Sequence, residues 1–148
     1  NFTGHYLRSE LKKRKGPIKT VLLDQKLVAG LGNIYVCEAL FKAGISPNRK
    51  AFTVQGQRSE KLRQAVLEVL DEAIEAGGSS LKDYKNITGE PGYFQHHFAV
   101  YNKTGRACPG CKCLAKNTAR VDNIDKGNGI RQIIQAGRST FYCPTYQR

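Results

Sequence analysis

A glycine-containing junction between residues 23 and 47 constrains the fold of this chain most strongly. An apolar run meets Gly30-Leu31-Gly32-Asn33, and from Ile34 onward apolar residues recur at helical spacing. Glycine lets the backbone adopt positive φ, and asparagine is favoured as a helix N-cap. We therefore predict a turn at Gly30 and Gly32 and a helix capped by Asn33. The free N–H groups of its first turn would suit a phosphate, although the junction alone also fits a purely structural turn.

Basic residues outnumber acidic ones, 24 to 12, and they are unevenly placed along the chain. Residues 1–50, 51–100 and 101–148 carry net charges of +7, −2 and +7. Two basic ends suggest two patches that converge on one polyanion, and the alternative is a basic surface that only aids solubility. We do not expect a membrane partner, because the sequence has neither a signal-peptide layout nor a run of about 18 apolar residues.

Apolar periodicity predicts an all-helical unit over residues 1–84. We expect a first helix over residues 2–15 and a short helix over 18–23 that leaves Lys19 exposed. The clearest helix runs from Ser59, as its N-cap, to about Glu75. Its apolar face comprises Leu62, Val66, Val69, Leu70, Ala73 and Ile74.

The stretch from Leu23 to Pro47 resembles the helix-two-turn-helix element of formamidopyrimidine-DNA glycosylases and their endonuclease VIII relatives. The match includes Asp24-Gln25-Lys26 before the glycines and Ala43-Gly44-Ile45-Ser46-Pro47 after the helix. The resemblance implies that Asn33, the amides around Gly32 and the side chain of Lys19 hold phosphates that flank a damaged nucleotide.

A turn-rich loop follows the helices, and Gly89-Glu90-Pro91-Gly92-Tyr93-Phe94 resembles the base-recognition loop of that family. The resemblance implies that Gly89, Glu90, Gly92 and Tyr93 cover a base taken out of the stack. Without the resemblance, residues 85–98 could be a plain connector. The residues from His97 to Tyr101 have the alternation of a strand, on which the adjacent His96 and His97 would face opposite sides and share no metal.

The five cysteines argue against a disulfide scaffold, and their odd number suggests a reducing compartment. The sequence contains the two knuckles expected of a zinc ribbon, at Cys108-Pro109-Gly110-Cys111 and Cys143-Pro144-Thr145-Tyr146. The second knuckle has a tyrosine at the position of the fourth ligand. In addition, 31 residues separate Cys111 from Cys143. Three outcomes remain open: Cys113 is the fourth ligand, water or another group is, or the finger binds no zinc.

The segment Gly137-Arg138-Ser139-Thr140-Phe141-Tyr142-Cys143 resembles the family's zinc-finger hairpin. The resemblance implies that Arg138 reaches toward the DNA backbone, whereas alone it would be an ordinary exposed charge. We read residues 114–136 as an insertion of unassigned function. The expected fold is thus mainly α with a small β part: a helix-two-turn-helix domain (1–84), a loop and connector (85–98) and a zinc-finger-like β-hairpin subdomain (99–148).

The resemblance covers nearly the whole chain but only the C-terminal half of such an enzyme. Family members begin with a catalytic proline followed by glutamate, whereas this chain begins Asn1-Phe2-Thr3. We expect the DNA-binding half of a repair glycosylase and abasic-site lyase for oxidised bases, with oxidised purines preferred, inactive by itself. Its partner would be damaged double-stranded DNA, bound by a monomer in the bacterial cytoplasm with one zinc ion. The alternative is a non-catalytic nucleic-acid-binding zinc-ribbon protein.

Overall fold

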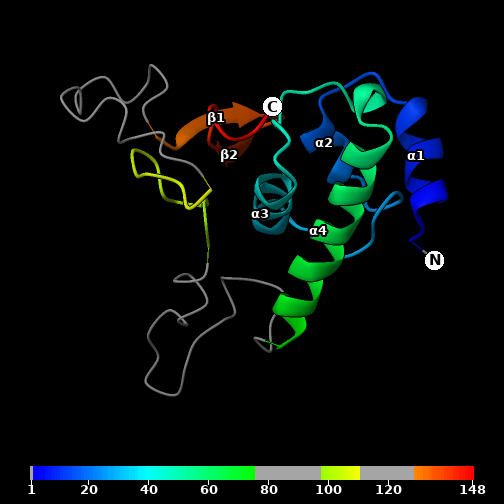
Figure 1. The fold of residues 1–148 in the computed structure, drawn as a ribbon, viewed down its shortest axis with the longest axis horizontal. Coiled ribbons are helices and arrows are strands. Elements are labelled where there is room, and N and C mark those ends of the chain that lie inside the picture. The colour runs from blue at the N-terminus through cyan, green and yellow to red at the C-terminus, as the bar shows by residue number, and fades with distance from the viewer. Residues whose placement is uncertain (1, 76–97, 111–128) are drawn as a thin grey trace.

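A computed structural model describes residues 2–75, 98–110 and 129–148 (Figure 1). It confirms a mainly α fold with a small β part. The elements are α1 (Gly4–Lys12), α2 (Ile18–Leu22), α3 (Asn33–Ala43), the 3-10 helix η1 (Ala51–Thr53), α4 (Gln57–Glu75), β1 (Arg131–Gln135) and β2 (Arg138–Tyr142). The hairpin lies beside α3, on the side away from α1 (Figure 1).

The first helix is shorter than its pattern predicts. Thr3 is its N-cap and accepts a 3.1 Å hydrogen bond from the backbone N–H of Tyr6, so the helix begins at Gly4. Its buried face consists of Leu7 and Leu11, and it packs against α4 and η1. The connection to α2 is held by an isolated antiparallel bridge between Pro17 and Lys50.

Helix α4 packs along α3 and supplies much of the main core. It begins at Gln57, so Ser59 is not the N-cap we predicted; the Ser59 hydroxyl instead donates to the carbonyl of Gly56 at 2.7 Å. Ile74, which we assigned to the apolar face, is 77% exposed because the end of α4 extends past α3 (Figure 1). No helix in the described part of the chain is long and apolar enough to cross a membrane.

A second, smaller core lies between α3 and the hairpin. The helix contributes Cys37 and Phe41, and the members from later in the chain are Val100, Cys108, Ile130, Phe141 and Cys143. The strands pair in antiparallel register from Arg131 opposite Tyr142 to Gln135 opposite Arg138. Ala136 and Gly137 have φ of 50° and 77°, as a two-residue hairpin turn of the primed type requires.

Two expectations for the segments around this core need correction. The described part of the predicted strand at 97–101 is not a strand, because its backbone N–H groups bind a side chain of α3, as shown below. Residues 131–135, which we placed in an insertion, form β1. The rest of that range, up to residue 128, lies outside the described residues.

Candidate nucleic-acid interface

The turn before α3 is built around one glycine and one glutamine side chain. Gly30 has φ of +86°, as predicted, and its N–H donates to Gln25 Oε1 at 2.9 Å. The amide of Gln25 in turn donates to the carbonyl of Leu31 at 3.2 Å, and Leu31 is fully buried. Gln25 therefore fixes the path of the chain into α3, a role that we did not infer from the sequence.

Asn33 is the first residue of α3 and not its cap. Gly32 is the N-cap, with extended φ of −88° that any residue can adopt, and no side chain caps the helix. Our prediction of positive φ at Gly32 and of capping by Asn33 was wrong because the Asn33 side chain makes longer-range contacts. No side chain therefore caps the N-terminus of α3, and the N-cap residue, Gly32, is exposed to solvent. The N-terminus of this helix is thus accessible to an anion.

Both ends of the Asn33 amide are bound. Its Oδ1 accepts a 2.5 Å hydrogen bond from Lys19 Nζ, and its Nδ2 donates to the backbone carbonyl of Ser139 at 3.0 Å. The first contact comes from α2 and the second from β2, the strand that begins with Arg138. A single side chain therefore links the short helix, the helix N-terminus and the hairpin.

Lys19 is fully buried, whereas we expected it to be exposed. The helix that carries it is only five residues long, and Ile18, Val21 and Leu22 around it are buried as well. Burial lowers the pKa of Lys19; the nearby Cys37 raises it and the positive charge of Arg138 lowers it. Lys19 and Arg138 are thus close enough to interact, and an anion at this site would relieve their repulsion.

Arg138 stands at the start of β2, next to the hairpin turn, and is exposed. Within the described ranges it has no ion pair or hydrogen bond from its guanidinium group. The structure therefore brings Lys19, Gly32, Asn33 and Arg138 together, and we call these four residues the phosphate cluster. They combine positive charge with free backbone donors, which is the chemistry that binds phosphate.

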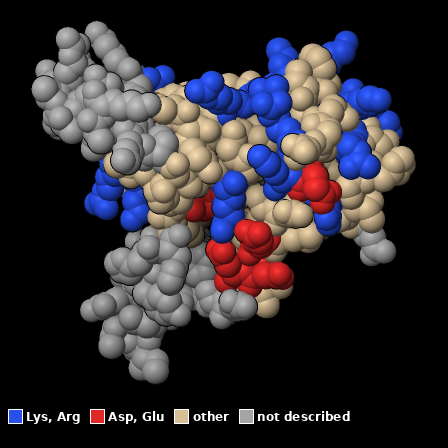
Figure 2. All heavy atoms as spheres, viewed as in Figure 1, with Lys and Arg blue, Asp and Glu red and all other residues tan. Residues whose placement is uncertain are grey.

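Basic side chains predominate on the face drawn in Figure 2. Lys and Arg side chains are spread widely over it, whereas the largest group of acidic side chains lies in its lower middle part and smaller ones lie among the basic side chains. The acidic residues exposed on α4 are Glu68, Asp71 and Glu72. The excess of basic side chains favours binding of a polyanion.

A buried glutamate anchors the segment that precedes the hairpin. Glu38 lies within α3 and is 6% exposed, and its carboxylate accepts from the N–H groups of Ala99, Val100 and Tyr101 at 2.7, 3.0 and 3.0 Å. Burial raises the pKa of Glu38, and the three N–H donors partly oppose that rise. We did not identify this residue from the sequence, although an acid between Cys37 and Ala39 in an apolar helix was a usable signal.

The thiol on the same helix is a core group. Cys37 is buried, and burial raises its pKa to about 11, so it is protonated at neutral pH. A protonated, buried thiol is a poor nucleophile. The structure therefore places Cys37 among the packed side chains of the smaller core.

The described part of the expected zinc finger contains two buried cysteines, Cys108 and Cys143. The backbone N–H of Tyr146 points to Cys143 Sγ at 3.4 Å, as in a turn that presents a thiolate. The Tyr146 ring packs on Phe41, with centroids 4.9 Å apart, and against Gly110. Among the described residues no group of three metal-binding side chains occurs, and the other two cysteines of the expected finger, Cys111 and Cys113, lie outside these residues.

Hydrogen bonds to α3 and its following loop also hold the turn after β2. Gln147 is 2% exposed; its Oε1 accepts from the N–H of Cys143 at 2.8 Å and its Nε2 donates to the carbonyl of Ile45 at 2.9 Å. The N–H of Arg148 donates to the carbonyl of Gly44 at 2.9 Å. These bonds tie residues 143–148 to the C-terminal end of α3.

Several predicted site residues lie outside the described residues. They are the base-recognition residues Gly89, Glu90, Gly92 and Tyr93, and the cysteines Cys111 and Cys113.

The helical part of the chain matches a known domain. The sequence model of the formamidopyrimidine-DNA glycosylase H2TH domain matches residues 1–85. Formamidopyrimidine-DNA glycosylases from Rhodospirillum centenum and Rhodospirillum rubrum are 55% and 51% identical over 147 residues. Each alignment covers 99% of this chain but 48% and 49% of the relative, so the chain spans about half the length of these proteins.

Solved structures agree with this match over the whole chain. The MutM (Fpg) protein of Thermus thermophilus superposes with a TM-score of 0.78 at 40% identity, covering 99% of this chain and 50% of that protein. The Lactococcus lactis Fpg protein, in a complex with DNA that contains an abasic site, superposes with a TM-score of 0.79 at 35% identity, covering 99% of this chain and 48% of that protein.

Proposed function

The chain belongs to the formamidopyrimidine-DNA glycosylase family, and from this premise we propose that it is the DNA-binding half of a base-excision repair glycosylase and abasic-site lyase. The observation that carries the proposal is the double engagement of Asn33, by Lys19 and by the Ser139 carbonyl. It holds the N-terminus of α3 next to Arg138, so that helix N–H groups and a guanidinium can bind adjacent phosphates of one strand.

The partner in this proposal is double-stranded DNA with an oxidised base. Solved relatives have been captured with DNA that contains carbocyclic 8-oxo-G, Fapy-dG or an oxidised pyrimidine, which supports an oxidised base as the target. The preference for purines in this proposal rests on the resemblance of the loop at residues 89–94 to the base-recognition loop of the family. Gly89, Glu90, Gly92 and Tyr93 would cover the extruded base. Glu38 contributes indirectly, since it anchors residues 99–101 against α3.

The chemical step in this proposal requires residues beyond these 148. The family resemblance implies attack on the sugar by the amine of an N-terminal proline, which would release the base and lead to strand cleavage. The described thiol closest to the phosphate cluster, Cys37, is buried and protonated and cannot replace that amine. We therefore propose that this chain alone has neither glycosylase nor lyase activity.

One structural zinc ion per chain is part of the proposal. Cys108 and Cys143, with Cys111 and Cys113, would hold it, and the metal would stabilise the finger without taking part in the reaction. We further propose that the protein acts as a monomer in the bacterial cytoplasm, associated with the nucleoid through its DNA.

The test is a binding titration with duplex DNA that carries a stable abasic-site analogue. If the protein contacts about four phosphates, log K falls with log salt at a slope of about −3.6. Borohydride trapping on natural abasic DNA should yield no adduct with the chain alone. A slope near zero would contradict the DNA-binding proposal, and a trapped adduct specific to this chain would contradict its inactivity.

A further inference from the structure

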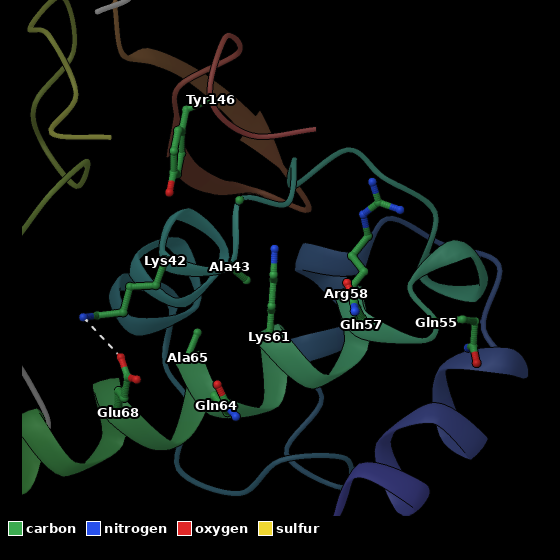
Figure 3. A pocket seen from close by; sticks show the side chains of 11 residues that line it. Lys42, Ala43, Gln55, Gln57, Arg58, Lys61, Gln64, Ala65, Glu68 and Tyr146 are labelled. Atoms are coloured by element: carbon green, nitrogen blue, oxygen red, sulfur yellow. Dashed lines mark ion pairs between the residues drawn. The ribbon is translucent and has the colours of Figure 1, made fainter. Parts of the chain in front are cut away.

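A groove separate from the phosphate cluster opens between the C-terminal end of α3, the first half of α4 and the turn after β2 (Figure 3). Its volume is about 740 Å³, and its lining includes Lys42, Arg58, Lys61, Gln64 and Tyr146. Asn33 begins α3 and Lys42 is near its end, so the two lie roughly 14 Å apart along the helix axis. The proposed phosphate contacts therefore leave this groove unused.

Two of the three cations in the groove have no partner among the residues that the structure describes. Lys42 is neutralised by Glu68 and Glu72, at 3.6 and 3.3 Å. Arg58 and Lys61 are exposed, and within residues 2–75, 98–110 and 129–148 they have no ion pair or side-chain hydrogen bond. Both project from α4 toward the side of the groove on which Tyr146 lies (Figure 3).

A further guanidinium increases the positive charge near Arg58. The Arg49 side chain donates to the backbone carbonyl of Arg148 at 3.2 Å, while its buried Nε has no hydrogen-bond partner among the described residues. Burial lowers the pKa of Arg49, and the positive charge of Arg58 lowers it further. Two like charges held near each other on a folded surface favour binding of an anionic group between or beside them.

The remaining walls of the groove suit a peptide. Tyr146 is 37% exposed and its ring is fixed against Phe41 and Gly110, so it offers a rigid aromatic surface. Gln57 and Gln64 provide side-chain amides, which can both donate to and accept from a peptide backbone, whereas the amide of Gln55 donates to the carbonyl of Arg8. A groove of this volume can take a short extended segment of a polypeptide.

We propose that this groove binds an acidic segment of a partner protein. Two carboxylates of the segment would pair with Arg58 and Lys61, and a neighbouring apolar side chain would pack on the Tyr146 ring. Recognition of acidic motifs by clustered cations is an established mode of peptide binding, and charge-assisted hydrogen bonds are its strongest contacts. Because the groove lies apart from the phosphate cluster, peptide and DNA should bind simultaneously.

The experiment uses the intact protein and a short fluorescein-labelled peptide rich in glutamate with one central phenylalanine. Fluorescence anisotropy should show binding, and the same peptide with glutamine in place of glutamate should bind at least about tenfold more weakly. The double variant Arg58→Glu, Lys61→Glu should weaken binding of the acidic peptide about tenfold or more. If this variant does not fold, as judged by circular dichroism, Arg58→Gln with Lys61→Gln takes its place.

The matched control is Lys12→Glu with Lys15→Glu, which makes the same charge change at two exposed residues around the end of α1. It should leave peptide affinity within about twofold, since neither residue lines the groove and salt weakens the effect of exposed charges outside it. Equal weakening by both double variants, or no binding of the acidic peptide, would overturn the proposal. Displacement of the peptide by undamaged duplex DNA would also overturn it and assign the groove to the DNA surface.

Discussion

The side-chain amide of Asn33 donates a 3.0 Å hydrogen bond to the backbone carbonyl of Ser139, a residue 106 positions later in the chain. This contact joins the helix-two-turn-helix element to the hairpin directly beside Arg138. A hydrogen bond from a side chain to a backbone carbonyl fixes position as well as distance. The donors proposed for two phosphates are therefore held in a fixed relation before DNA arrives, which lowers the entropic cost of binding.

Asn33→Ala should weaken DNA binding about tenfold or more, because it removes a proposed phosphate contact and releases the hairpin. It also leaves the buried ammonium of Lys19 without its hydrogen-bond acceptor, which should lower the free energy of unfolding by about 1–3 kcal/mol. Titration with abasic-analogue DNA and chemical denaturation measure the two effects. Gln64→Ala, at an exposed position of α4, is the control. Lower stability with unchanged affinity would make Asn33 purely structural.

Arg138→Ala should reduce affinity for all DNA sequences alike and make the salt slope shallower by about one. The reason is that a single phosphate contact releases about one counterion. Binding titrations across a range of salt concentrations measure the slope. Lys12→Ala removes an equivalent charge from α1, on the far side of α3 from the hairpin, and should leave the slope unchanged (Figure 1). Equal slopes for the Arg138 variant and the unmodified protein would argue against the contact.

Glu38→Gln should destabilise the fold, because one amide oxygen cannot replace a carboxylate that accepts three N–H groups. We expect a loss of about 1–3 kcal/mol in the free energy of unfolding. Loss of the anchor at residues 99–101 should also weaken binding to lesion DNA more than to undamaged duplex. Asp71→Asn, at an exposed position of α4, is the control and should have little effect on either quantity.

The pH dependence of the Glu38 effect has a defined sign. Burial raises the pKa of Glu38 in the folded state, so the folded protein binds a proton more readily than the unfolded chain. The contribution of Glu38 to stability therefore falls as pH rises from the ordinary glutamate pKa, about 4.3, through the raised value. Denaturation of the protein and its Gln variant at several pH values should show their difference growing toward low pH. A difference that grows toward high pH would contradict a raised pKa.

Local patterns in the sequence predicted most of the helical unit. The spacing of Leu62, Val66 and Val69 identified α4, because apolar residues three or four positions apart lie on one face of a helix. The position of Ser59 within the helix was missed because serine is favoured both as a cap and in hydrogen bonds to a nearby carbonyl. The segment after residue 97 has strand-like alternation, but Glu38 takes the N–H groups that a neighbouring strand would need.

The sequence motifs identified the residues of the phosphate cluster but not the contacts between them. The motifs named Lys19, Gly32, Asn33 and Arg138, and all four lie together in the structure. The burial of Lys19 and the use of both ends of the Asn33 amide depend on contacts between residues far apart in the chain. Such contacts leave no local pattern in a sequence. At Tyr146, the sequence alone showed that a tyrosine replaces the fourth cysteine of the expected finger. Only the structure showed that its ring packs on Phe41.

The last prediction concerns the metal. If Cys113 is the fourth ligand, the purified protein should contain one zinc ion per chain, and Cys113→Ser should release it under mild chelation. Because the turn at residues 143–148 is also held by Gln147 and by the N–H of Arg148, loss of zinc should leave the helices intact. Tyr146→Cys would supply the thiolate at the usual position and should make zinc resistant to the chelator in the Cys113→Ser background. Metal analysis and circular dichroism before and after chelation measure both effects. A protein that contains no zinc yet binds DNA through Arg138 would show that the finger folds without metal.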